Sequence, residues 1–222
     1  MKRLTWGLLA LLILTGAASS AANTLDIYFI DVEGGQATLM VTPAGESFLI
    51  DAGFPTNGTF ASKPGPPAQA RDAQRILAAA RDAGVRQIDH LMLTHYHADH
   101  MDGVIELAQL LPIRHVIDHA APSAEAEMGV PGTLALYNAY VARRTAGRHT
   151  EPKPGDRLPL GGVDVIMLAS AGEILTAPLP GAGQPNPTCT GSGEPARIKR
   201  KPHARPPSAC SLVRFAFSTS VI

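Results

Sequence analysis

Neither sign of charge predominates in this sequence. Its 222 residues include 19 basic and 19 acidic side chains, so the formal net charge at pH 7 is zero. A strongly basic chain would indicate a nucleic acid or an anionic membrane surface as partner. This composition gives no such indication, but it is compatible with a local basic patch. Hydrophobic residues make up 45% of the chain, which allows a core of ordinary size in one domain or in a fragment of a larger one.

The N-terminal apolar run is too short to span a bilayer comfortably. Lys2 and Arg3 precede it, it extends over residues 4–14, and the small residues 16–22 follow. This order is typical of a secretory signal. We predict a signal peptide over residues 1–22, cleavage after Ala22, and a mature chain that works in the periplasm or outside the cell without further membrane contact. A retained anchor helix is the alternative.

Cysteine is scarce: only Cys189 and Cys210 occur. They lie at the edges of a segment rich in Gly, Ser, Pro, Arg and Lys that has no apolar periodicity before Ser211. A disordered or linker tail over residues 190–222 is one interpretation. A disulfide-closed loop is another, since an exported chain permits that bond.

Strand and helix patterns alternate along the rest of the chain and predict an α/β fold. Apolar runs separated by Gly turns predict strands, and apolar spacing of three and four residues predicts helices. The expected helices are 69–83, 101–111 and 133–146. The expected strands lie within 25–51, at 88–93, at 113–119, and in a hairpin of 158–160 with 163–168.

One strand end carries a cluster of candidate metal ligands. The apolar residues 91–93 are followed by His95, His97, Asp99 and His100. In an extended segment His95 and His97 leave the same side, and Asp99 and His100 follow as the chain turns into a helix. Imidazole and carboxylate are ligands that zinc prefers. A polar loop whose histidines only form hydrogen bonds is the alternative, but four ligand-type residues in six positions favour a metal.

This stretch resembles the His-x-His-x-Asp-His signature of the metallo-β-lactamase superfamily. The resemblance implies an αββα sandwich with one or two zinc ions, Mn²⁺ or Fe being possible substitutes. It assigns His95 and His97 to the first ion and Asp99 and His100 to the second. Asp99 would also orient the attacking hydroxide, which makes it the candidate catalytic residue.

Two further segments resemble one branch of the superfamily. Residues 30–37 are similar to the Asp-Val-Gly-Gln-Gly-Asp element of the ComEC-like metallo-hydrolase domain of DNA-uptake proteins, although the glycine order differs. Residues 49–53 resemble the Leu-Ile-Asp-Thr-Gly strand end of the superfamily. There Asp51 is expected to brace the histidine loop; a plain turn aspartate is the alternative.

Asp118 and His119 end the expected strand 113–119. Parallel pairing would bring them to the same sheet edge as the histidine loop. The resemblance implies that such a strand end lines the pocket without coordinating metal, so both are predicted to be pocket residues. A ligand role for His119 is the alternative.

Three expected features of the superfamily have no counterpart here. Glyoxalase-type members carry a third metal-binding histidine after a strand such as 163–168, whereas this chain has residues 169–173 without one. ComEC-like members also lack it, which favours that branch. The bridging aspartate and the late histidine are missing too. The sandwich, over residues 23–189, is therefore expected to be incomplete at its C-terminus.

A shift of reading frame near Cys189 would account for the unusual tail. With one choice of codons, residues 215–222 read in another frame give Arg-Phe-Phe-Asp-Leu-Gly-Asp-Leu. That resembles the strand and Gly-Asp turn where the family keeps its bridging aspartate. We therefore expect the tail to be either disordered or frame-shifted.

The function that follows from the resemblance is metal-dependent hydrolysis outside the cytoplasm. Metal-activated water would attack a phosphodiester or, second, a carboxylic ester or amide such as a β-lactam. The alternative is a truncated, non-catalytic metal-binding remnant, and a redox role with iron is a more distant possibility. A small molecule or a phosphodiester is the expected partner. The sequence does not set the oligomeric state.

Overall fold

The computed structural model describes residues 24–122, 130–144, 147–180 and the backbone of 212–217. The predicted signal peptide, residues 1–22, lies outside the described residues. So does most of the predicted tail, 190–222, and the Cys189–Cys210 pair. The described part of that tail, Leu212–Phe217, forms a strand. Within the described residues, no helix combines the length and apolar character that crossing a membrane requires.

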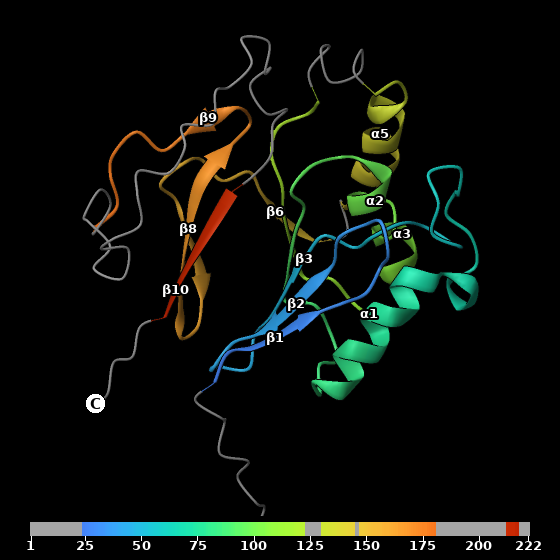
Figure 1. The fold of residues 1–222 in the computed structure, drawn as a ribbon, viewed down its shortest axis with the longest axis horizontal. Helices are drawn as coiled ribbons and strands as arrows, with labels where there is room; N and C mark the ends of the chain where they lie inside the picture. Colours follow the sequence, from blue (N-terminus) through green and yellow to red (C-terminus); the bar gives the residue numbers. More distant parts are fainter. Residues whose placement is uncertain (1–23, 123–129, 145–146, 181–211, 218–222) are drawn as a thin grey trace, which may run out of the picture.

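A six-stranded sheet forms the middle layer (Figure 1). Its first three strands are antiparallel, and the last three continue in parallel with β3, so the described sheet is mixed. In spatial order its strands are β1 (Asp26–Phe29), β2 (Thr38–Val41), β3 (Ser47–Ile50), β4 (His90–Met92), β5 (His115–Ile117) and β6 (Arg148–Thr150).

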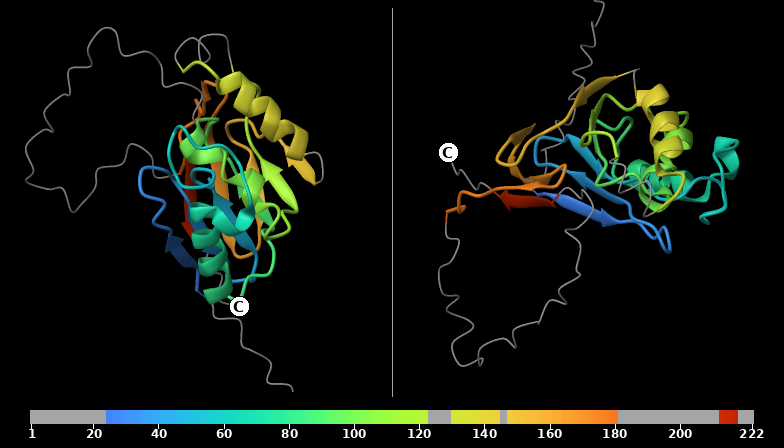
Figure 2. Two further views of the ribbon diagram at one scale, coloured as in Figure 1. Left: turned by 90° about the vertical axis from the view of Figure 1, so that its right-hand side faces the viewer. Right: turned by 90° about the horizontal axis from the view of Figure 1, so that it is seen from above.

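A second, antiparallel sheet lies against one face of the first (Figure 2). The predicted hairpin provides β7 (Arg157–Leu160) and β8 (Val163–Ser170), and β9 (Glu173–Ile174) pairs with β8. Strand β10 (Leu212–Phe217) pairs with the other edge of β8, from Leu212 opposite Ala169 to Phe217 opposite Val163.

Helices cover the opposite face of the six-stranded sheet (Figures 1 and 2). They are the short η1 (Pro67–Gln69), α1 (Arg71–Asp82), α2 (Ala98–Met101), α3 (Val104–Leu107) and α5 (Thr133–Arg144). The sequence of layers, helix then sheet then sheet, confirms the predicted α/β sandwich.

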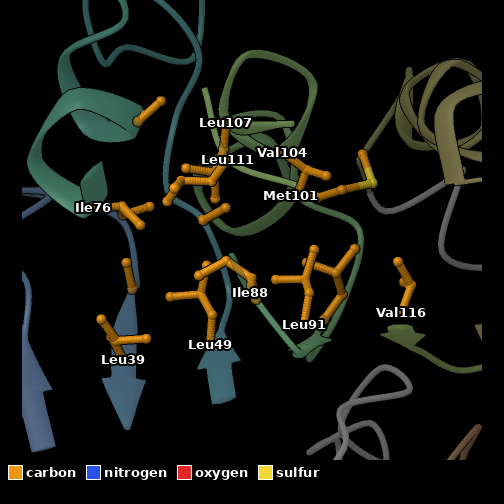
Figure 3. Close-up of a cluster of buried hydrophobic side chains, with 14 of the residues drawn as sticks. Leu39, Leu49, Ile76, Ile88, Leu91, Met101, Val104, Leu107, Leu111 and Val116 are labelled. Carbon is orange, nitrogen blue, oxygen red and sulfur yellow. The ribbon is translucent and has the colours of Figure 1, made fainter. Parts of the chain in front are cut away.

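Alternation along the central strands divides the core in two. Leu39, Leu49 and Leu91 face the helices and pack with Ile76 and Leu107, as Figure 3 shows. Their neighbours Met40, Phe48 and Met92, with Ile117, face the second sheet instead and pack against Leu158, Val165 and Met167. Because both faces are covered, the central strands are apolar on both sides, and polar residues are confined to their ends.

The predicted helix 101–111 is wrong in its extent. Two short helices, α2 and α3, occupy this stretch and are separated by Asp102 and Gly103. The Ala52 N–H donates to the His100 carbonyl at 2.7 Å, and the Gly103 N–H donates to the Gly53 carbonyl at 3.1 Å. A Cβ on residue 103 would lie 2.1 Å from the Ala52 oxygen. Contact with residues 52–53 therefore interrupts the helix, which local periodicity could not reveal.

Candidate metal centre

The candidate site lies at the carboxyl edge of the parallel strands. The strand register places Ile50, Met92, Ile117 and Thr150 in one row across β3 to β6. The residues that follow this row are therefore brought together, as the carboxyl ends of parallel strands always are. Ligands in open α/β sheets bind at such an edge.

Asp51 is fully buried at the end of β3 and holds the histidine loop. Its backbone is left-handed, with φ at 58°. Thr94 donates to it twice, from its N–H to Oδ1 at 2.8 Å and from its hydroxyl to Oδ2 at 2.7 Å. His100 Nδ1 donates to Oδ2 at 2.7 Å. Burial raises the pKa of Asp51, and its bonds with His100 and Thr94 oppose that rise. This arrangement is the one that the predicted bracing role requires.

The hydrogen bonds of the loop assign the protons on His95 and His100. Thr94 has one hydroxyl hydrogen, and Asp51 accepts it, so the Thr94 oxygen accepts from His95 Nδ1 at 3.1 Å. His95 Nε2 is then a lone pair. His100 gives its Nδ1 hydrogen to the Asp51 carboxylate, so when the ring is neutral its Nε2 is also a lone pair.

Burial and the charges of His100, His97 and His119 lower the pKa of His95 to about 3. Its ring is therefore neutral near pH 7, as ligation requires. Burial opposes protonation of His100, but the hydrogen bond and charge of Asp51, together with Asp99, raise its pKa.

The predicted ligands form two close pairs. His95 Nε2 lies 3.1 Å from His97 Nδ1, and His100 Nε2 lies 3.5 Å from Asp99 Oδ2. Two ligands of one tetrahedral zinc, each about 2.0–2.1 Å from the ion, are separated by roughly 3.3 Å. Ligand atoms of His95, Asp99 and His100 also lie within 4.8 Å of one another, a group that His97 does not join. Asp99 Oδ1 is buried and has no hydrogen-bond partner among the described residues. This donor set fits a zinc-class cation.

The turn at residues 33–36 contacts the same loop through the backbone. The Gln36 N–H donates to the Asp99 carbonyl at 3.1 Å. A Cβ on residue 35 would lie 2.5 Å from that carbonyl oxygen, so only glycine fits there. The glycine-containing element singled out in the sequence thus positions Asp99 through its backbone.

Asp118 lies one strand away and has a different environment. It is buried at 1% exposure and accepts from Tyr140 Oη at 2.5 Å, Arg144 Nη1 at 2.8 Å and His149 Nε2 at 2.6 Å. With Glu151 it forms a second group of possible ligands. Arg144 already supplies a positive charge to this carboxylate, so the group is an ion-pair network rather than a cation site.

His119 is 3% exposed and lies at the same sheet edge. Its Nδ1 donates to the Ala120 carbonyl at 2.8 Å. Two contributors were not predicted from the sequence, Thr94 and His149. The position of Thr94 directly before the first histidine of the motif was the sequence feature that could have indicated its role. The sequence of β6, Arg148–Thr150, carries no feature that could have indicated the role of His149.

Residues 30–187 match the model of the family described as the metallo-beta-lactamase superfamily. The chain belongs to this superfamily. The motif and the fold expected from it therefore agree with the match.

Several solved structures of metallo-β-lactamases are similar to this chain. A HARLDQ-motif mutant enzyme from Cronobacter sakazakii shares 25% identity, with 67% of this chain and 52% of that chain covered and a TM-score of 0.41. MEM-A1, a subclass B3 enzyme from a soil metagenome library, shares 20% identity over 69% and 53%, with a TM-score of 0.41. MIM-1 from Novosphingobium pentaromativorans shares 17% identity over 68% and 50%, with a TM-score of 0.44.

The chain spans about half the length of the solved structures that it matches. No curated protein matches it.

Proposed function

We propose that this chain is an exported, metal-dependent hydrolase in which His95, His97, Asp99 and His100 hold zinc. The observation that carries the proposal is an excess of acceptors at one point. Asp99 Oδ1 is buried without a hydrogen-bond partner among the described residues, and Asp99 Oδ2 lies 3.5 Å from His100 Nε2, which is an acceptor when the ring is neutral. A buried acceptor without a partner costs about 1–3 kcal/mol, and a bound cation removes that cost. Manganese and iron are the alternative metals.

Each protein residue has a distinct task in this proposal. When bound, a zinc-class cation would activate water and polarise the carbonyl or phosphoryl oxygen of the substrate, so that water attacks the adjoining carbon or phosphorus atom. Asp99 Oδ1, free of other partners, accepts a hydrogen bond from the attacking water and orients it. Asp51 fixes the Nδ1 proton on His100, which keeps Nε2 directed at the centre. Thr94 holds Asp51 in turn.

A phosphodiester is the first substrate class that we propose, on the resemblance of residues 30–37 and 49–53 to the ComEC-like branch. A carboxylic ester or amide is the second.

The test combines metal analysis with turnover. The full chain is loaded with zinc or manganese and assayed against a chromogenic phosphodiester and a chromogenic β-lactam. Two bound ions per chain and turnover of one reporter are expected, and Asp99→Asn, assayed at saturating metal, should lose at least about 100-fold in kcat. Absence of bound metal in the unaltered protein would overturn the proposal.

A non-catalytic metal-binding protein is the second candidate. It is favoured by the absence of any histidine between His149 and His203 in the sequence, because the superfamily resemblance leads one to expect a further histidine from a later strand. One weakly bound ion without turnover of either reporter would establish this alternative.

Export is proposed from the N-terminal pattern alone. N-terminal sequencing of protein recovered from the periplasm or the medium should give a chain that begins at Asn23. Recovery of the intact segment 1–22 in the membrane fraction would favour an anchor instead.

A further inference from the structure

His119 uses only one side of its imidazole ring. The Ala120 carbonyl can only accept a hydrogen bond, so the contact at 2.8 Å places the proton on Nδ1. Burial lowers the pKa of His119, although the Ala120 carbonyl, Asp118 and Glu151 oppose the shift. The ring is therefore neutral near pH 7, and Nε2 carries a lone pair.

That lone pair has no partner. His119 Nε2 and Asp99 Oδ1 are the two buried side-chain atoms of the described residues that lack a hydrogen bond. Tyr96 restricts the ring from one side, since the two ring centroids lie 4.4 Å apart, and the Tyr96 hydroxyl donates to the His119 carbonyl. The ring is thus held in place with an unsatisfied acceptor, which calls for a cation or a donor that the described side chains do not provide.

The strand register brings His119 to the sheet edge that carries the candidate metal centre, although His119 is not among the three residues whose ligand atoms lie within 4.8 Å of one another. Strand β5 pairs with β4 so that Ile117 lies opposite Met92. His119 and Thr94 are each two residues beyond that pair, and His95 follows Thr94 directly.

We propose that His119 is a further nitrogen ligand of this metal centre, through Nε2. The inference rests on the proposed function, because it needs the centre built by His95, His97, Asp99 and His100. Metal-binding histidines donate their other ring nitrogen to a carboxylate or a backbone carbonyl, as His100 and His119 both do here. Strand β5 thereby supplies an imidazole that the segment after β8, residues 169–173, does not.

Cobalt(II) provides a direct test, because its visible absorption reports on the number and type of its ligands. The background protein is the full chain with Cys189→Ser and Cys210→Ser, so that no native thiol contributes. His119→Cys in this background should produce a thiolate-to-cobalt charge-transfer band on titration with Co²⁺. His119→Phe, which keeps an aromatic ring beside Tyr96, should bind Zn²⁺ at least about 10-fold more weakly and shift the cobalt spectrum.

The two proposals fail in different ways. If the background protein binds metal and His95→Ala abolishes binding, but His119→Cys gives no charge-transfer band, the ligand role of His119 is overturned and the proposed function stands. If the background protein binds no metal, the proposed function fails first. Thermal melting of both His119 variants in a chelator verifies that they are folded, and the band in His119→Cys is diagnostic even if His119→Phe is unstable.

Discussion

Two polar clusters at one sheet edge differ in how far protein donors satisfy their carboxylates. Both the His95–Asp99–His100 group and the Asp118–His149–Glu151 group bring three possible ligands within 4.8 Å. In the second, Tyr140, Arg144 and His149 all donate to the Asp118 carboxylate. In the first, the carboxylate of Asp99 retains an oxygen that has no hydrogen-bond partner in the part of the chain that the structure describes. Distance alone does not distinguish a metal site from an ion-pair network, but the balance of donors and acceptors does.

The largest expected effect is on metal binding. His95→Ala should weaken zinc binding at least about 100-fold, because it removes one of few nitrogen ligands. His149→Ala should leave zinc affinity unchanged, since Arg144 already neutralises its cluster. Competition with a chromogenic chelator measures both constants. Equal losses in the two variants would show that the comparison is mistaken.

The free energy of unfolding, measured in a chelator, should depend more on the Asp118 cluster than on the His95–Asp99–His100 group. Arg144→Met leaves the buried Asp118 without its cation and removes a guanidinium that lies 5.7 Å from the centre of the Tyr140 ring. We expect the free energy of unfolding to fall by about 2–4 kcal/mol. Asp99→Asn should change it by less than about 0.5 kcal/mol, because Oδ1 has no hydrogen-bond partner among the described residues and Oδ2 lies 3.5 Å from its one ionic neighbour, His100 Nε2. Urea denaturation with EDTA present compares the two, and a larger loss in Asp99→Asn would contradict the assignment.

A smaller effect on zinc affinity is expected from a change at Thr94, whose hydroxyl is hydrogen-bonded to Asp51 and His95. Thr94→Val removes the hydroxyl that binds Asp51 and orients His95. Zinc affinity should fall about 10-fold, the lower end of the effect of such supporting groups. Thr94→Ser keeps the hydroxyl and is the matched control. Wild-type affinity in Thr94→Val would show that Asp51 needs no second brace.

The smallest effect concerns histidines that belong to neither cluster. His115, on the face toward the second sheet, contacts His90 with Nδ1 atoms 3.0 Å apart. Burial, then His90, Arg148 and His149, lower the pKa of His115 to about 4. The unfolded chain takes up this proton below about pH 6.5 and the folded chain only below about 4, so stability is lost as pH falls through that window.

His115→Gln should remove part of this dependence, about 1–2 kcal/mol between pH 7 and pH 4. Urea midpoints at a series of pH values test the expectation. An unchanged slope in the variant would mean that other groups account for the acid sensitivity.

The sequence allowed accurate prediction where local patterns decide the structure. Helix α1, the strands that carry Asp51 and Leu91, and the hairpin of β7 and β8 lie where periodicity and turn residues indicated. The superfamily motif predicted four ligands; the structure brings ligand atoms of His95, Asp99 and His100 within 4.8 Å of one another and places His97 Nδ1 3.1 Å from His95 Nε2. The partners of Asp118 could not be predicted, because Tyr140, Arg144 and His149 approach it only through the packing of α5 and β6. The unpaired nitrogen of His119 is likewise a property of the folded edge.

The backbone contacts beneath the ligand loop have a consequence for protein engineering. The carbonyls of Asp99 and His100 accept hydrogen bonds from Gln36 and Ala52, and Gly103 binds Gly53. None of these backbone bonds involves a ligand side chain, and the Asp99 side chain, unlike that of His100, makes no bond to Asp51. Exchanging Asp99 for histidine or cysteine should therefore alter the preferred metal toward softer cations without rebuilding the fold. The backbone of the loop is therefore a framework on which ligand side chains can be exchanged one at a time.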